Sequence, residues 1–183
     1  MKVTVSVHGR WHAFELANGL HKRGLLDSLI TTYPAFAARK FLDTGIRLQT
    51  RPWLELRRRL YDRFSLGTRP DTYIAKSFAK FLARNMKGDS DIFVGWSSAP
   101  LEAIGPAQTA GMKVVIERGS SHIGHQSDVL ARAYEQIGLP HTATDPEIID
   151  RELAEYDLAD AIAVPSRFAA SAISSPSPNF PGI

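Results

Sequence analysis

The chain has 183 residues, no cysteine and a formal net charge of +3, with 44% apolar and 22% charged side chains. This length and composition predict one globular domain with a sizeable core. The lack of cysteine excludes a disulfide scaffold, a thiolate metal site and cysteine catalysis, and it agrees with a cytoplasmic location. The first residues alternate like a strand and form no apolar signal segment, and no apolar run approaches 18 residues, so we expect neither export nor a membrane span.

The charged side chains are distributed unevenly along the chain. Residues 39–87 carry 13 basic and 4 acidic side chains, whereas residues 88–183 carry 5 basic and 13 acidic ones. A basic middle on an otherwise acidic chain favours one face that meets phosphate or anionic lipid. The alternative is a set of solvated helices with no partner.

The opening of the chain predicts a parallel βαβ unit. Residues 2–8 alternate as a strand, Gly9 lies in a tight loop, residues 13–23 have an apolar helical face, and residues 25–32 form a second strand. The loop holds a single glycine, so the three-glycine dinucleotide fingerprint is absent. A nicotinamide or flavin domain is therefore disfavoured.

Residues 34–87 are predicted to form helices with short breaks. One helix carries an apolar stripe at spacings of three and four, formed by Trp53, Leu56, Leu60 and Phe64. Arginines occupy much of its remaining surface, namely Arg57, Arg58, Arg59 and Arg63. A basic amphipathic helix of this kind can lie on an anionic membrane, so peripheral contact through the Arg57–Arg63 helix is one expectation. The other is that the stripe packs against the sheet.

The second half of the chain continues the alternation of strands and helices. Short buried strands are predicted at 91–96, 113–117 and 161–165. Ser98 is expected to cap the helix that follows the first of these, and Asp145, followed by Pro146, to cap a later one. Residues 174–183 form an irregular tail rich in serine and proline.

These elements predict a three-layer, Rossmann-like α/β fold with a mainly parallel sheet. We expect its core to include Val5, Val7, Ile30, Phe93, Val115, Ile116, Ile162 and Val164.

A polar loop follows the buried strand of Val114, Val115 and Ile116. In open α/β sheets, ligands bind in the crevice beyond the carboxyl ends of the strands, and in a parallel sheet these ends share one edge. The loops after the first strand and after Ile116 should therefore converge there, unless they merely cap separate helices. The predicted site residues are Gly9, Arg10, Trp11, His12, Arg118, Gly119, Ser120, Ser121 and His122.

Two stretches resemble a known family. Residues 152–168 read E-L-A-E-Y-D-L-A-D-A-I-A-V-P-S-R-F, and residues 5–24 include L-A-N-G-L-H-K-R-G. Both resemble the N-terminal domain of family-4 glycosyltransferases of the GT-B fold. The resemblance covers most of residues 1–173. It implies the acceptor-binding half of a retaining enzyme that transfers a sugar from a nucleotide-sugar donor, usually without an essential metal, to a sugar or lipid-linked acceptor.

The resemblance also implies roles for individual residues. The Gly9 loop would lie near the acceptor and the donor phosphates. His122 resembles the family histidine that points at the transferred sugar, and His125 is a rival for that role. The family's donor domain, with its phosphate-binding cations, has no counterpart here, so we expect a truncated transferase, inactive alone, in the cytoplasm or at the inner face of the membrane.

Other functions stay open at this stage. A stand-alone Rossmann-like module could hold a phosphorylated ligand with Arg10 and Arg118. A histidine metal site could use the pair His8 and His12 or the pair His122 and His125, but no carboxylate ligand stands out beside either, so we expect no metal. No nucleic-acid-binding module and no serine-nucleophile elbow is present, and we expect no nucleic-acid partner.

Overall fold

The computed structural model describes residues 1–64, 69–86 and 89–174. Its centre is a six-stranded sheet in the order β3-β2-β1-β4-β5-β6, and every neighbouring pair is parallel. The strands are β1 Val3–Val7, β2 Leu26–Thr31, β3 Leu48–Thr50, β4 Ile92–Trp96, β5 Lys113–Glu117 and β6 Ala161–Ala163. The helices are α1 Ala13–Lys22, α2 Ala35–Ala38, α3 Pro52–Phe64, α4 Asp71–Asn85, α5 Leu101–Thr109, α6 Ile123–Gln136, α7 Pro146–Leu158 and α8 Arg167–Ser174.

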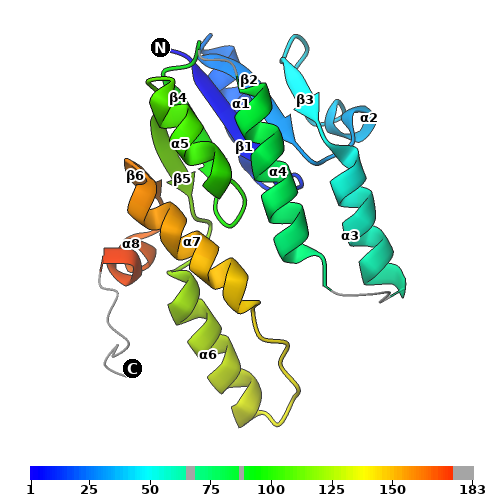
Figure 1. The fold of residues 1–183 in the computed structure, drawn as a ribbon, viewed down its shortest axis with the longest axis vertical. Coiled ribbons are helices and arrows are strands. Elements are labelled where there is room, and N and C mark those ends of the chain that lie inside the picture. The colour runs from blue at the N-terminus through cyan, green and yellow to red at the C-terminus, as the bar shows by residue number, and fades with distance from the viewer. Residues whose placement is uncertain (65–68, 87–88, 175–183) are drawn as a thin grey trace.

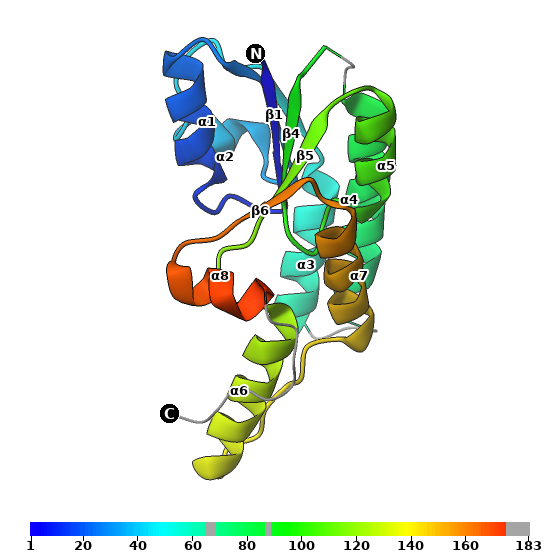
Figure 2. The same cartoon turned by 90° about the vertical axis from the view of Figure 1, so that its left-hand side faces the viewer.

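Helices cover both faces of this sheet, as Figures 1 and 2 show. One core lies between the sheet and α1, around Val5, Phe14 and Leu29. The other lies between the sheet and α4, α5 and part of α3, around Phe78 and Ile104. The predicted three-layer, Rossmann-like fold is therefore confirmed, and the sheet is wholly parallel.

The central strands β1 and β4 are almost entirely buried because both of their faces are covered. All five residues of β1 are buried, and the hydroxyl of Thr4 lies 2.8 Å from that of Ser90, which satisfies both polar groups inside the protein. Of the predicted core, Val5, Val7, Ile30, Phe93 and Ile116 are fully buried.

Three residues of the predicted core, near one edge of the sheet, are not fully buried. Ile162 and Val164 are only half-buried, because β6 is an edge strand with a neighbour on one side alone, and Val115 is half-buried next to it. The opposite edge strand, β3, has three residues and was not predicted from the sequence. Ser174 belongs to α8, and the rest of the predicted tail lies outside the described residues.

Helix α3 does not bury its apolar stripe. It buries Leu54 and Glu55, while the stripe residues are all exposed: Trp53, Leu56, Leu60 and Phe64. The expectation that this stripe packs on the sheet is wrong, because α3 packs against α4 at the margin of the sheet with its other side. Within the described ranges, no helix combines the length and the apolar character needed to cross a bilayer.

Candidate functional site

A cavity of about 670 Å³ lies at the carboxyl edge of the sheet. Its walls come from the loops that follow β1, β4 and β5, from the first turns of α4 and α7, and from Arg69. The carboxyl ends of parallel strands share one edge, and this is where open α/β sheets bind ligands. We call this cavity the crevice.

The structure brings both predicted loops to the crevice. Trp11 and His12 from the loop after β1 line it together with Arg118, Gly119 and Ser120 from the loop after β5. The two loops are in contact, since Nε2 of His12 lies 3.3 Å from Oε1 of Glu117. The His12 ring also meets the ring of Trp96 edge-on, at a centroid distance of 5.0 Å.

Gly119 lies directly beside the His12 ring. A Cβ atom at Gly119 would lie 3.6 Å from Cε1 of His12, which is an ordinary van der Waals distance. The two loops therefore also meet at this position.

Gly9 and Arg10 are adjacent to the crevice but do not line it. Gly9 has a φ of +83°, its N–H donates to Oγ1 of Thr32 at 2.8 Å, and its carbonyl accepts from Thr31. The guanidinium of Arg10 lies 4.1 Å from the centroid of the Phe41 ring, and neither residue lines the crevice. Gly9 therefore shapes the turn, and the structure turns Arg10 away from its predicted partners.

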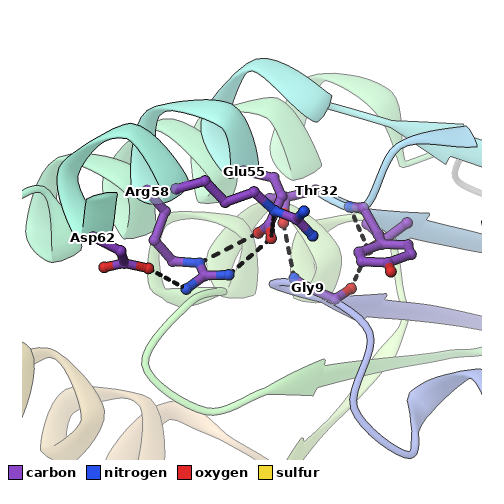
Figure 3. Close-up of polar contacts among 8 residues, drawn as sticks. Gly9, Thr32, Glu55, Arg58 and Asp62 are labelled. Atoms are coloured by element: carbon purple, nitrogen blue, oxygen red, sulfur yellow. Dashed lines mark hydrogen bonds and ion pairs between the residues drawn. The ribbon is translucent and has the colours of Figure 1, made fainter. Parts of the chain in front are cut away.

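Figure 3 shows Gly9 and Thr32 beside the ion pairs of α3. There Arg58 bridges two carboxylates, with Nη2 at 2.8 Å from Glu55 and Nη1 at 2.8 Å from Asp62. Burial alone would raise the pKa of the Glu55 carboxyl, but hydrogen bonds from Arg58 and Arg59 outweigh it and lower this pKa.

His122 caps the start of α6, and the neighbouring Ser121 contacts Arg118. The Nδ1 atom of His122 accepts from the Gly124 N–H at 3.2 Å as the N-cap, and the His122 ring lies 5.5 Å from that of Tyr156. Burial lowers the pKa of His122. The Ser121 carbonyl accepts from Nε of Arg118 at 2.9 Å. Neither residue lines the crevice, and the ring of His125 packs on Phe168 at 6.2 Å.

A buried acid holds the floor of the crevice together. The Glu152 carboxylate, which has no exposed surface, accepts from the hydroxyls of Ser98 and Tyr156 and pairs with Nε of Arg118 at 3.0 Å. Arg118 also donates to Gln126. Because several partners hold this arginine, its guanidinium has a fixed orientation before any ligand arrives.

A second buried acid replaces the predicted cap of α5. The Ser98 side chain bonds to Glu152, and Ser98 adopts a φ of +70°. Its N–H and that of Leu101 donate instead to the Glu155 carboxyl, at 2.7 and 3.2 Å. The prediction that Ser98 caps α5 is therefore wrong, because a carboxyl from α7 reaches the same orphan N–H groups. The Asp145 cap of α7 is confirmed, with Glu147 N–H at 2.9 Å.

Burial raises the pKa of Glu155 to about 8, and the neighbouring charge of Glu152 adds to this effect. The sequence contained a signal for this pair of acids: Glu152, Glu155 and Tyr156 are three and four residues apart, which places them on one face of a helix. The hydrophobic spacing around them did not reveal that this face is buried.

His8 is a crevice residue that sequence reasoning considered only as a metal ligand. It follows β1 directly and lines the crevice, and its buried Nε2 atom has no hydrogen-bond partner among the described residues. Burial lowers its pKa, which favours the neutral imidazole. A buried polar atom of this kind is completed by a ligand or a water molecule. Among the described residues, no three His, Asp or Glu side chains are placed to hold a metal ion.

Fold and crevice together define the class of the protein: an α/β protein with a Rossmann-like parallel sheet and a ligand-sized crevice at its carboxyl edge. A comparison of the sequence with protein-family models and with curated proteins finds no match.

Proposed function

We propose that this chain is the acceptor-binding half of a retaining glycosyltransferase of the GT-B type, which transfers a sugar from a nucleotide-sugar donor to a sugar or lipid-linked acceptor. One observation carries the proposal: Trp11 and His12 meet Arg118, Gly119 and Ser120 around a single crevice. The parallel sheet agrees with the Rossmann-like half that the sequence resemblance implies.

The crevice offers the groups that a sugar requires. Trp11 and Trp96 line the crevice, and an indole ring is the kind of flat apolar surface that packs on the C–H face of a sugar ring. Neutral His8, with its unpaired Nε2, and Ser120 can exchange hydrogen bonds with sugar hydroxyls. The contact with Glu117 orients the His12 ring at the rim. The proposed role of these groups is to bind and orient a saccharide.

The charged groups of the crevice suit a saccharide better than a nucleoside diphosphate. When a nucleoside diphosphate leaves, negative charge develops on phosphate and must be stabilised by cations or helix N-termini. Two arginines line the crevice, Arg69 and Arg118, but both already pair with carboxylates, Arg69 with Asp71 and Arg118 with Glu152. We therefore infer that saccharide binding is strong here relative to phosphate stabilisation, as expected of an acceptor-side half.

We expect the 183-residue chain to bind saccharides or nucleotide sugars without transferring sugar at a useful rate. Titration calorimetry with a panel of such ligands, followed by product analysis after long incubation with donor and acceptor together, measures both quantities. Turnover comparable to that of an intact transferase would contradict the assignment of a half site. Binding of none of the saccharides would contradict the proposal as a whole.

The Trp11→Ala variant is expected to weaken binding of the best ligand by about tenfold, because it removes an aromatic surface from the crevice. Trp53→Ala is the matched control, since Trp53 on α3 is 72% exposed and Trp11 is 69% exposed, but only Trp11 lines the crevice. Calorimetric affinities of the two variants check the prediction. Equal affinities in both variants would remove Trp11 from the site.

The second candidate is a stand-alone module that binds a phosphorylated ligand. Arg69 and Arg118 on one crevice favour it. Arg10 does not, because its guanidinium stacks on Phe41. Tight binding of small phosphorylated compounds, with no preference for those that carry a sugar, would select this alternative.

A further inference from the structure

Helix α3 presents a continuous apolar surface to the outside of the protein. Its stripe residues are exposed to 72% at Trp53, 41% at Leu56, 49% at Leu60 and 59% at Phe64. With about 3.6 residues per turn, these positions lie on one face of the helix. We call this surface the α3 stripe. Side chains as apolar as these are normally covered when they occur together.

The charges of α3 are ordered around this stripe. By helical position, Arg57 lies along one side of the stripe and Arg63 along the other, while both acids of the helix, Glu55 and Asp62, lie on the opposite face. Those acids are engaged by Arg58, and Glu55 also by Arg59 at 2.9 Å. The stripe is thus bordered by cations, and the negative charges of the helix are directed away from it.

An aromatic contact extends the same surface onto α4. The Arg57 guanidinium lies 4.1 Å from the centroid of the Tyr73 ring, and Tyr73 is 52% exposed. Tryptophan, tyrosine and arginine at the border of an apolar patch are the side chains that favour the boundary between lipid headgroups and acyl chains.

We propose that the α3 stripe docks the protein onto an anionic lipid bilayer, with Trp53, Leu60 and Phe64 entering the interface and Arg57 and Arg63 meeting lipid phosphates. A helix with one apolar aromatic face and bordering arginines lies in the plane of such an interface. Each arginine near an anionic surface adds to the attraction.

A second exposed apolar helix in the described chain lacks this charge arrangement. Helix α6 exposes Val129, Leu130 and Tyr134, but it carries two acids, Asp128 and Glu135, and one arginine, Arg132. Its charge does not complement anionic lipid. Of these two helices, α3 is the one that combines an exposed apolar face with an excess of cations, and this difference favours an anionic surface as the occupant.

The position of α3 in the fold determines where membrane docking would place the crevice. Figure 1 shows α3 projecting past the carboxyl ends of the strands, at the same end of the molecule as the loops of the crevice. Docking through α3 therefore holds the crevice near the headgroups. The identity of the acceptor, unlike the docking itself, rests on the proposed function: with a sugar acceptor in the crevice, that acceptor is a lipid-linked saccharide.

Vesicle co-sedimentation of the full chain tests the docking independently of sugar transfer. The probes are vesicles of phosphatidylcholine alone and vesicles with a substantial share of phosphatidylserine. We expect binding to the phosphatidylserine vesicles, weakened by added salt, and at least tenfold weaker binding to phosphatidylcholine. Leu60→Glu should lower the affinity for the anionic vesicles by about tenfold or more, since a leucine leaves the apolar phase.

Two matched variants control for general effects of the substitutions. Leu139→Glu makes the same change at a leucine of similar exposure, 55% against 49%, which follows α6 and is not part of the α3 stripe. Arg63→Glu, on the border of the stripe, should also weaken binding to the anionic vesicles, and Arg132→Glu on α6 is its control. Both controls should bind vesicles like the unaltered chain, and thermal melts should show that all four variants fold.

Three outcomes would overturn the proposal. One is equal binding to both kinds of vesicle, and another is equal loss in Leu60→Glu and Leu139→Glu. The third is self-association that Leu60→Glu abolishes, without vesicle binding, which would assign the α3 stripe to a second copy of the chain. None of these outcomes bears on saccharide binding by the crevice, so the two proposals fail separately.

Discussion

Replacing Arg118 by methionine is expected to lower the free energy of unfolding by about 3–5 kcal/mol, because it removes one partner of a buried ion pair. Glu152 has no exposed surface and pairs with Nε of Arg118 at 3.0 Å. Without the guanidinium, the carboxylate stays buried with only the hydroxyls of Ser98 and Tyr156 as donors. Urea denaturation followed by circular dichroism measures the loss.

Two further variants separate the ion pair from the mere loss of an arginine. Arg132→Met changes an arginine that donates to the carbonyl of its own helix at Asp128, and it should cost less than about 0.5 kcal/mol. Adding Glu152→Gln to Arg118→Met should restore part of the stability, since the uncompensated charge is then absent. A double variant as unstable as the sum of both single ones would show that the pair is not coupled.

The sheet could be predicted from the sequence because its signals are local. Val114 to Ile116 form an uninterrupted apolar run, which suits a strand covered on both faces. Pro146 after Asp145 marks a helix start with its cap. Parallel pairing then fixes which loops meet, so the sequence alone predicts that Trp11 and His12 lie near Arg118.

The remaining features depend on contacts between distant segments. Arg10 sits in a predicted site loop, yet its guanidinium stacks on Phe41, whose position the local sequence does not fix. The α3 stripe has the spacing of a core-facing surface, and only the packing of α3 through Leu54 leaves it exposed. Ser98 resembles a cap, but Glu155 arrives from a helix 57 residues later in the chain and takes its place.

The stability of the protein is expected to fall as the pH rises from about 5 to 8, as far as Glu155 determines it. The folded protein holds a proton on this carboxyl up to a pKa of about 8, whereas the unfolded chain releases it near the ordinary value of 4.5. Between these pH values the unfolded state binds fewer protons than the folded state, so rising pH favours unfolding. The slope is about 1.4 kcal/mol per pH unit for one proton. The contribution is complete below pH 4.5 and lost as the pH passes about 8.

Glu155→Gln isolates this contribution from those of other groups. Burial lowers the pKa values of His8 and His122, which makes stability rise with pH through the ordinary range of histidine and opposes the Glu155 effect. Both histidines are present in the variant, so the difference between the two stability profiles reports Glu155 alone. We expect the variant to lose stability at pH 5, where its amide replaces one accepting oxygen at the start of α5, and to approach the parent protein at pH 8. Parallel profiles across this range would mean that Glu155 ionises at its ordinary pKa and that its carboxylate caps α5 in the charged form.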